Sequence, residues 1–383
     1  EHNHEQFRSV FLRSDGIVDF CYAATHLADV INAVSDEHAI ATRKLFRTMY
    51  GKNFDIQVIG VLNGSGKTWK SDLLRKHEAE GKEISQDAIF EIHQEGKVEA
   101  FNEVEARTGI KLDLNKFTVW MVRRLAGYKS QYLMLRFLAH ILCAHRERVF
   151  AKDELRSIWF RDIPNLQADY NRALAGEVLD YMFKEREVVH GLGMQVVIGG
   201  PIVEEKTIFW AHEFEKWTKE VEDLRGSFVY VPKSDARLLK MQAIGADNCS
   251  ETPKPLKEAC GTSGQRTALN GGVALGIKGA GPIELINDYN EVTGEGNGFL
   301  IGSYVDSSDS GLEANMHKFY VEGPGDILSK MEVMSRLYYD HKDGWKKLML
   351  ESYKNANIKV TAKAMEERYA LRVYGQAIKA RIN

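Results

Sequence analysis

The chain has 383 residues, which is enough for two or more compact domains, because single cores stop growing near ~250–300 residues. Its 44% hydrophobic and 27% charged residues are typical of a globular protein, and its net charge of −3 argues against bulk binding to nucleic acid or to an anionic membrane. The four cysteines show no CxxC spacing and no apolar run approaches the ~18–20 residues of a membrane span, so we expect reduced thiols and a cytoplasmic location, with neither nucleic acid nor membrane as partner.

The first third of the chain is mostly helical in pattern. Apolar residues recur at helical spacing over residues 17–50 and predict two helices. Residues 54–62 predict a strand that ends in the turn pair Asn63-Gly64. Residues 70–108 are charged and mostly helical, which we interpret as a connecting segment rather than part of a core.

From about residue 115, short β-rich runs alternate with amphipathic helices. This order is the signature of a parallel sheet with helices on both faces, so the predicted fold class is α/β with a doubly wound sheet. The alternating elements are predicted at 117–122, 130–147, 194–198, 205–223, 227–231 and 234–243. Residues 150–188 carry two further helical patterns and are predicted to form an insertion, and three closing helices are predicted over 326–380.

A glycine-rich stretch, EACGTSGQRTALNGG at 258–272, stands just before a helical run at 265–269. A turn of this kind presents free backbone N–H groups and the positive end of a helix dipole, which suit an anion. The carboxylate of Glu258, at its leading edge, would suit the hydroxyls of a sugar. A plain connection between turn and helix explains the same residues, and both interpretations stay open at this point.

A second cluster follows the strand predicted at 117–122, with Arg123, Arg124 and Lys129. Ligands of open α/β sheets bind beyond the carboxyl ends of the strands. Arginine would give a phosphate bidentate hydrogen bonds there, and lysine would add a point charge. A solvated basic turn is the alternative.

Two other kinds of site are poorly supported. The segment at 60–68 resembles a phosphate-binding loop, G-x-x-x-x-G-K-[ST], but Val61 occupies the place of its first glycine, so a P-loop NTPase is the weakest alternative. The histidine pairs, such as His140 and His145, have no cysteine or carboxylate companions at metal spacing, so no metal is predicted.

Read in order, the motifs resemble those of the glycogen and maltodextrin phosphorylase family. The stretch at 258–272, followed by GPIELI and GEGNGFLIGSY, resembles the family's active-site segment, E-A-[SC]-G-T-x-x-x-K-x-x-L-N-G. VRRLAGYKSQ at 122–131 is similar to its phosphate-site segment, and INAVSDEHAIATRKLF at 31–46 to its V-N-G-V-x-x-x-H segment. LNGSGKTW at 62–69 resembles a T-N-G-x-x-x-x-x-W turn, which accounts for the near-miss phosphate loop. Only 150–188 is largely unmatched.

The resemblance implies the two-domain GT-B architecture of glycosyltransferases. Residues 1–110 would be the C-terminal part of the N-terminal domain plus a linker, 111–325 the Rossmann-like catalytic domain, and 326–383 the closing helices. Because the sequence starts at Glu1 rather than Met, we expect a fragment or a processed product. Two kinds of protein partner are left open. The N-terminal portion could be present as a separate chain, and the protein could form a homo-oligomer.

The implied activity is that of a retaining α-glycosyltransferase. It would transfer a hexosyl unit between a phosphorylated donor, either a sugar 1-phosphate or a nucleotide sugar, and a glucan-like or other hydroxyl acceptor. Arg124, Lys129 and Glu258 are the implied catalytic residues, with the first two on the donor phosphate and Glu258 on the sugar. The implied substrate-binding residues are Asn32 near the sugar's 6-hydroxyl, Ala259, Cys260 and Gly261 along the sugar, Gly261 and Thr262 at a second phosphate, and Arg266.

The sequence also departs from the family. Arg266 stands where the family has its Schiff-base lysine, and a guanidinium has no free nucleophilic nitrogen, so no covalent pyridoxal phosphate is expected. Noncovalent pyridoxal phosphate is left open. Further departures lie at 126–127 and 199–201. The alternative function is a catalytically degenerate homologue that acts as a carbohydrate-binding or regulatory subunit.

Overall fold

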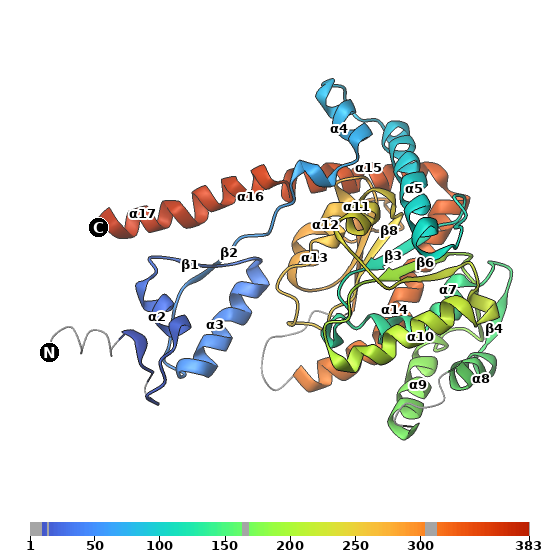
Figure 1. Cartoon of the computed structure of the whole chain (residues 1–383), viewed down its shortest axis with the longest axis horizontal. Helices are drawn as coiled ribbons and strands as arrows, with labels where there is room; N and C mark the ends of the chain where they lie inside the picture. The colour runs from blue at the N-terminus through green and yellow to red at the C-terminus, as the bar shows by residue number, and fades with distance from the viewer. Residues whose placement is uncertain (1–9, 14, 163–167, 303–311, 383) are drawn as a thin grey trace.

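The computed structural model describes residues 10–13, 15–162, 168–302 and 312–382. A six-stranded parallel sheet forms its centre (Figure 1). The order of its strands is β10-β9-β8-β3-β6-β7. The strands are β3 (Thr118–Val122), β6 (Gln195–Gly199), β7 (Phe228–Val231), β8 (Asn248–Glu251), β9 (Val273–Ile277) and β10 (Gly298–Ile301). Every residue in them is buried, as is typical of parallel strands with helices on both faces. The predicted doubly wound α/β fold is confirmed.

Alternate residues of the strands face two separate cores. Val119 and Met121 of β3 belong to the larger cluster, whereas Trp120 and Val122 belong to the cluster on the other face. The helices that cover the sheet are α5 (Gln86–Thr108), α6 (Gln131–Arg136), α7 (Ala139–Cys143), α10 (Ile208–Lys219), α11 (Ala236–Gly245), α12 (Ser263–Ala268), α13 (Ala280–Leu285), α14 (Leu312–Asp340) and α15 (Lys342–Lys359). Short 3-10 turns lie at Lys67–Trp69, Gly127–Lys129, Glu205–Thr207 and Glu222–Leu224.

Helix α5 differs from its expected role as a connecting segment. It follows α4 (Asp72–Ala79), begins after the capping residue Ser85 and packs along α11 and α15. Its buried side includes His93 and Lys97 besides apolar residues. The helix is therefore part of the core, although many of its residues are charged. The predicted helix 130–147 is also divided, into α6 and α7, and every residue in them is buried except the half-buried Leu133.

The predicted insertion consists of two helices flanked by a strand pair that the sequence analysis missed. Strand β4 (Val149–Ala151) pairs antiparallel with β5 (Val188–His190), and α8 (Lys152–Asp162) and α9 (Ala168–Met182) lie between them in the sequence. Helix α9 packs against α14. Residues 163–167, and the last two of the GEGNGFLIGSY segment, lie outside the described residues.

The N-terminal part forms a small unit beside the sheet. It contains α2 (Phe20–Leu27), β1 (Ile31–Ala33), α3 (Asp36–Tyr50) and β2 (Val58–Gly60), and β1 pairs parallel with β2. Strand β1 was expected to be helical; its three residues are too few to show a period of two. Gly60 is required in β2, because a Cβ atom there would lie 2.3 Å from the Asp36 carboxylate.

The C-terminal helices run from the sheet back across this unit (Figure 1). They are α16 (Ala362–Arg368), a π-helical turn (Tyr369–Tyr374) and α17 (Gly375–Ile382). Thr361 bridges to Ser65, and Val373 packs with Ile59 and Val61. No helix within the described ranges is both long and apolar enough to cross a membrane.

Candidate functional site

The order of the strands determines where a ligand would bind. From β3 the chain builds outward through β6 and β7, and then returns to the other side of β3 with β8, β9 and β10. The carboxyl ends of β3 and β8 therefore flank a switch point, the usual ligand site of an open α/β sheet. Lys129 follows β3, Glu258 follows β8, and their side chains form an ion pair. Two of the three expected catalytic residues thus meet at the switch point.

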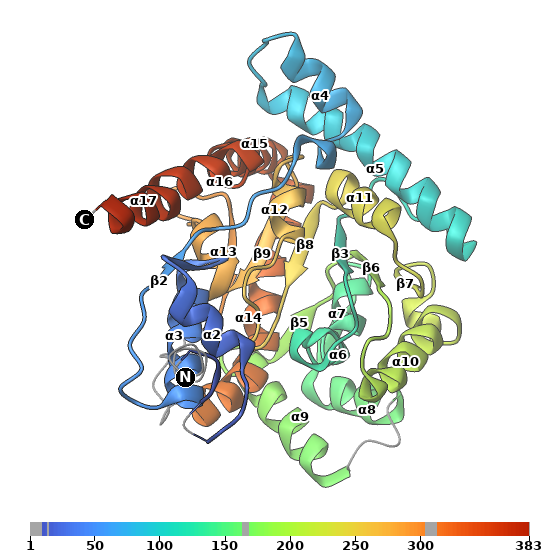
Figure 2. The same cartoon turned by 60° about the vertical axis from the view of Figure 1, so that its left-hand side comes forward.

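A cavity of about 420 Å³ lies beside this ion pair, between α3 and the loop after β8. Ser35 Oγ, at the start of α3, donates a hydrogen bond of 2.7 Å to the carbonyl of Ala259 and holds the two walls together. The lining residues are Glu37, His38, Ala41, Thr42, Lys44, Leu45, Thr48, Leu256, Lys257, Glu258 and Ala259. Figure 2 shows α3 beside the sheet domain, where it contacts α13.

His38 in this lining was not selected as a site residue, although it is the histidine of the V-N-G-V-x-x-x-H segment. The Val34 amide donates to its Nδ1 at 3.2 Å, and burial lowers the pKa of His38. A neutral imidazole in this orientation can donate from Nε2. Asn32, which was expected near the sugar, is not among the described residues that line this cavity. It is exposed in β1, and its Nδ2 donates a hydrogen bond of 2.9 Å to the Tyr369 hydroxyl.

The two neighbouring arginines have different surroundings. Arg123 is only 8% exposed and donates from Nη2 to Thr252 Oγ1 over 3.5 Å, while its Nε has no hydrogen-bond partner within the described part of the chain. Arg124, the one expected to bind phosphate, is exposed. The pair of arginines after a strand was the available signal, but it did not distinguish the buried member from the exposed one.

Glu251, the last residue of β8, was missed by the sequence analysis and is 5% exposed. A Cβ atom on Gly261 would lie 2.5 Å from its Oε1, and one on Gly264 would lie 3.0 Å from its Oε2, so its carboxylate rests on both glycines. Burial raises the pKa of Glu251, and Arg123 opposes this shift. The sequence contained no usable signal for it, because β8 is short and contains polar residues.

Arg266 packs against the turn that contains the near-miss phosphate loop. Its guanidinium carbon lies 3.7 Å from the centroid of the Trp69 ring. Asn270 donates to the carbonyls of Trp69 and Arg266 at 3.0 and 2.9 Å and fixes the contact. Burial lowers the pKa of Arg266, and Glu251 opposes the shift.

We expect Arg266→Ala to destabilise the fold by about 0.5–2 kcal/mol, the usual range for a cation–π contact. Urea unfolding of Arg266→Ala, Trp69→Ala and the double variant would isolate the pairwise contribution, since coupled residues give non-additive losses. Unchanged stability combined with weaker donor binding would show instead that Arg266 binds the donor.

The remaining residues of the glycine-rich loop are positioned by their neighbours. Gly281 makes room for Cys260, because a Cβ atom there would lie 2.8 Å from Sγ. Burial raises the pKa of the Cys260 thiol to about 12, so it is not a thiolate nucleophile at neutral pH. Thr262 precedes α12 without a side-chain capping bond. Within the described residues, no group of three or more His, Cys, Asp or Glu could hold a metal.

Two carboxylates meet where α3 contacts α13. The Asp36 amide donates to Glu284 Oε1 at 2.8 Å, and Glu37 lies against the backbone of Gly279. Burial, followed by the charge of Glu284, raises the pKa of Glu37 to about 7. The contact is therefore most stable below the ordinary pKa of a glutamate and weakens as the pH rises toward 7.

Glu37→Gln is expected to remove this pH dependence. The variant should be more stable than the parent at pH 8.5, by about 1–2 kcal/mol after allowance for solvent screening, and similar to it at pH 4.5. Melting temperatures across this range would measure the difference, with Glu83→Gln, at an exposed position, as control. A difference that did not change with pH would contradict the assignment.

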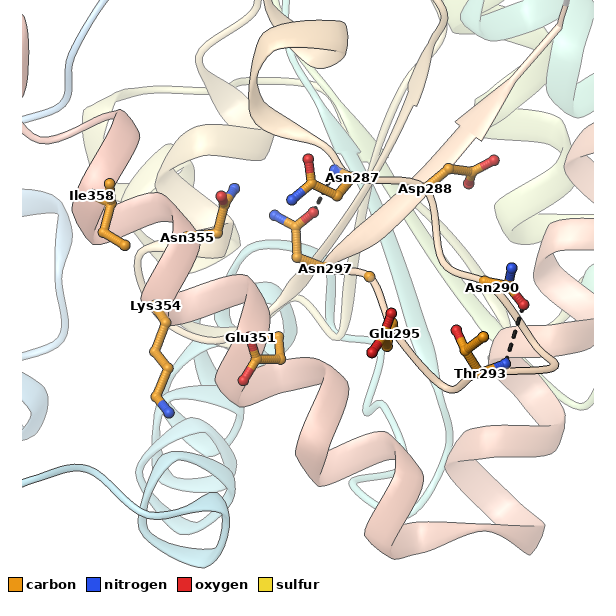
Figure 3. Close-up of a pocket in the computed structure, with 11 residues that line it drawn as sticks. Asn287, Asp288, Asn290, Thr293, Glu295, Asn297, Glu351, Lys354, Asn355 and Ile358 are labelled. Carbon is orange, nitrogen blue, oxygen red and sulfur yellow. Dashed lines mark hydrogen bonds between the residues drawn. The ribbon is translucent and has the colours of Figure 1, made fainter.

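A second cavity, of about 580 Å³, lies between the 287–297 loop and α15 (Figure 3). This cavity is larger than the one beside Lys129 and Glu258, but none of the expected site residues lines it. Most of the asparagine side chains that line it form hydrogen bonds within the fold. Asn297 accepts from the Asn287 amide, Asn290 accepts from Thr293, and Asn355 donates to the carbonyl of Leu285. These bonds shape the loop, and we assign the cavity no role.

The chain matches no model of a known protein family, but it is similar to individual proteins. It is 23% identical to maltodextrin phosphorylase of Thermococcus litoralis over 385 aligned positions, which cover 91% of this chain and 40% of that protein. Identity to glycogen phosphorylase of Haemophilus influenzae is 24% over 250 positions, covering 63% of this chain and 26% of that protein. The chain thus spans less than half the length of these relatives.

The fold is similar to that of a solved starch synthase. The catalytic domain of starch synthase IV from Arabidopsis thaliana, bound to ADP and acarbose, superposes with a TM-score of 0.59 at 14% identity, covering 97% of this chain and 59% of that chain. Together with the sequence relatives, this match makes the chain a divergent relative of the glycogen and maltodextrin phosphorylases, with the fold of a GT-B glycosyltransferase.

Proposed function

We propose that the chain transfers a hexosyl unit, with retention at the anomeric carbon, between a phosphorylated donor and a hydroxyl acceptor. The observation that carries the proposal is the Lys129–Glu258 pair at the switch point, beside the cavity under α3. The Lys129 ammonium group and the Glu258 carboxylate lie together, and they match the phosphate and the sugar hydroxyls of a sugar phosphate. The phosphate would bind Lys129, and a sugar hydroxyl would donate to Glu258.

The reaction would need no carboxylate pair of the glycosidase kind. As the bond between the anomeric carbon and the phosphate oxygen breaks, negative charge develops on the phosphate, and Lys129 would stabilise it. The leaving phosphate takes the proton of the acceptor hydroxyl, whose oxygen forms the new glycosidic bond on the same face. Arg124, exposed on the same loop, would approach the phosphate when the donor binds.

The residues of the site do not fit pyridoxal phosphate as the family holds it. Arg266 cannot form the imine, and its guanidinium is stacked on Trp69. We expect the purified chain to show no aldimine absorbance and no coenzyme trapped by borohydride. Mass spectrometry of the reduced protein measures this directly, and a pyridoxyl group on Lys278 or any other lysine would refute it.

The degenerate-subunit alternative is favoured by one observation. Lys129 forms an ion pair with Glu258, and Arg266 stacks on Trp69, so each of these side chains has a partner within the fold. A retained but inactive site would keep these contacts for stability alone.

A thermal-shift screen against glucose 1-phosphate, nucleotide sugars and maltodextrins would test the proposal. A phosphorylated sugar should raise the melting temperature with increasing concentration, since a ligand that binds only the folded state stabilises it. Lys129→Met should lose this response, whereas maltodextrin binding should persist. A response to maltodextrins alone, unaffected by Lys129→Met, would favour the regulatory subunit.

A further inference from the structure

The two walls of the cavity of about 420 Å³ belong to different parts of the chain. Helix α3 of the N-terminal unit forms one wall, and the loop after β8 forms the other. Two hydrogen bonds from the start of α3 join this unit to the sheet domain. Ser35 Oγ donates to the carbonyl of Ala259 at 2.7 Å, and the Asp36 amide donates to Glu284 Oε1 at 2.8 Å. The shape of the cavity therefore depends on whether α3 stays on the sheet domain.

The N-terminal unit is also attached to the C-terminal helices, which cross it (Figure 1). Val373 packs with Ile59 and Val61, and Ser65 bridges to Thr361 where the chain passes between the unit and the sheet domain. These contacts do not involve α3. The unit and the C-terminal helices can therefore turn together about the Ser65–Thr361 bridge, and this rotation would separate α3 from α13.

Two carboxylates lie on the two sides of the contact between α3 and α13. Glu37 of α3 lies against the backbone just before α13, where a Cβ atom on Gly279 would be 3.0 Å from Glu37 Oε2. Glu284 lies within α13, and both glutamates are half-buried. Two like charges repel each other more strongly in such a site than in water. Protonation of one carboxylate removes the repulsion and strengthens the contact.

The surroundings of the pair indicate which carboxylate takes up the proton. Burial raises the pKa of Glu284, but the Asp36 amide and the cations Arg368 and Arg372 oppose the shift. For Glu37, burial and the charge of Glu284 act in the same direction and raise the pKa to about 7. Glu37 therefore takes up the proton first. The other charged or titratable groups around this contact, within the described residues, are His38, Lys44, Lys257, Glu258, Cys260 and Lys359.

We propose that the N-terminal unit is a lid that pH controls: a proton on Glu37 holds α3 on α13 and closes the cavity, and loss of this proton opens it. The lid goes beyond the proposed transfer function, because it determines when any ligand reaches the cavity. The pKa of Glu37 is about 7 in the closed state and returns to its ordinary value once the side chain reaches water. Closure is therefore strongest below that ordinary value, weakens as the pH rises toward 7 and changes little above 7.

The distance between two spin labels would measure the opening without any ligand. Lys52→Cys places one label just after α3, and Glu220→Cys places the other just after α10 in the sheet domain, both at exposed positions. Cys21→Ser and Cys260→Ser remove the two cysteines that are not buried. The labelled chain with these four substitutions is the parent for the comparison.

In this parent, a longer distance should be roughly ten-fold or more as populated at pH 8.5 as at pH 4.5, because each unit of pKa shift changes the ratio of the two states ten-fold. With Glu37→Gln, the shorter distance should persist at pH 8.5. Glu83→Gln, at an exposed position, should behave as the parent does. A parent distribution that does not change with pH, or a Glu37→Gln distribution that changes as the parent's does, would overturn the proposal.

The lid and the transfer function can fail separately. A ligand that binds only the closed cavity must take up a proton at pH 6. Calorimetry of glucose 1-phosphate at pH 6, in two buffers with different heats of ionisation, should show greater proton uptake by the chain than by Glu37→Gln, and no difference at pH 8.5. Binding with equal proton uptake at pH 6 would show that closure does not control the cavity. If glucose 1-phosphate does not bind while the label distances still depend on Glu37, the transfer function is wrong and the lid stands.

Discussion

Lys129→Ala should lower the rate of sugar transfer by roughly 10²-fold or more, the loss typical of removing one group that stabilises charge in the transition state. Lys129 lies in the loop after β3, is 7% exposed and pairs with Glu258. The missing ammonium would leave the departing phosphate without its buried cation. The loss should appear in kcat as well as kcat/KM, because the charge on the phosphate grows as the bond breaks.

Two further variants serve as comparisons for Lys129→Ala. Arg124→Ala removes an exposed cation from the same loop, and we expect a loss of similar size if Arg124 joins Lys129 at the phosphate. Lys219→Ala removes an exposed lysine from α10 and should leave transfer unchanged. Near-full activity of Lys129→Ala would show that the phosphate binds elsewhere.

Lys97→Met should destabilise the fold by about 3–5 kcal/mol, the usual result of removing one partner from a buried ion pair. Lys97 and Asp247 have fully buried side chains, and Nζ donates to Asp247 Oδ2 at 2.6 Å and to the Lys116 carbonyl at 2.7 Å. Burial alone would raise the pKa of Asp247, and Lys97 with His93 holds it below its usual value. Without Lys97 the carboxylate would be left largely uncompensated in the core.

Denaturant unfolding would measure the loss, which is a large part of the ~5–15 kcal/mol that stabilises a typical domain. Lys97→Met,Asp247→Asn should recover part of it, because both charges are then removed. Lys346→Met, which breaks the surface pair with Asp87, should change stability little. A small effect of Lys97→Met would mean that water reaches Asp247.

The sequence predicted the sheet where its strands are continuous apolar runs. Strands β3 and β6 were found for this reason, since both faces of a parallel sheet are buried. Strands β1 and β8 have only three and four residues and contain polar ones, so residue pattern alone did not reveal them. Helix α5 was misjudged because Lys97 is charged, and its burial depends on Asp247, a residue 150 positions away.

The candidate site could be predicted where a motif supplied both the residue and its role. Lys129 and Glu258 are distant in the sequence, and only the neighbouring positions of β3 and β8 bring them together. The sequence did not show which of Arg123 and Arg124 is buried, because this depends on the direction in which the chain leaves β3. Glu251 has no motif, and its position became evident only from the glycines against which it rests.

The return of the C-terminal helices across the N-terminal unit has a consequence for the order of folding. Asn32 bonds to Tyr369, 337 residues away, and Ser65 pairs with Thr361. Contacts over such separations form late, because the intervening chain must first be brought together. During synthesis, the segment around β1 and β2 emerges before the sheet and lacks its partners until the C-terminal helices have been made. We therefore expect the parallel sheet to become protected from amide hydrogen exchange first, and the segment around β1 and β2 to be among the last.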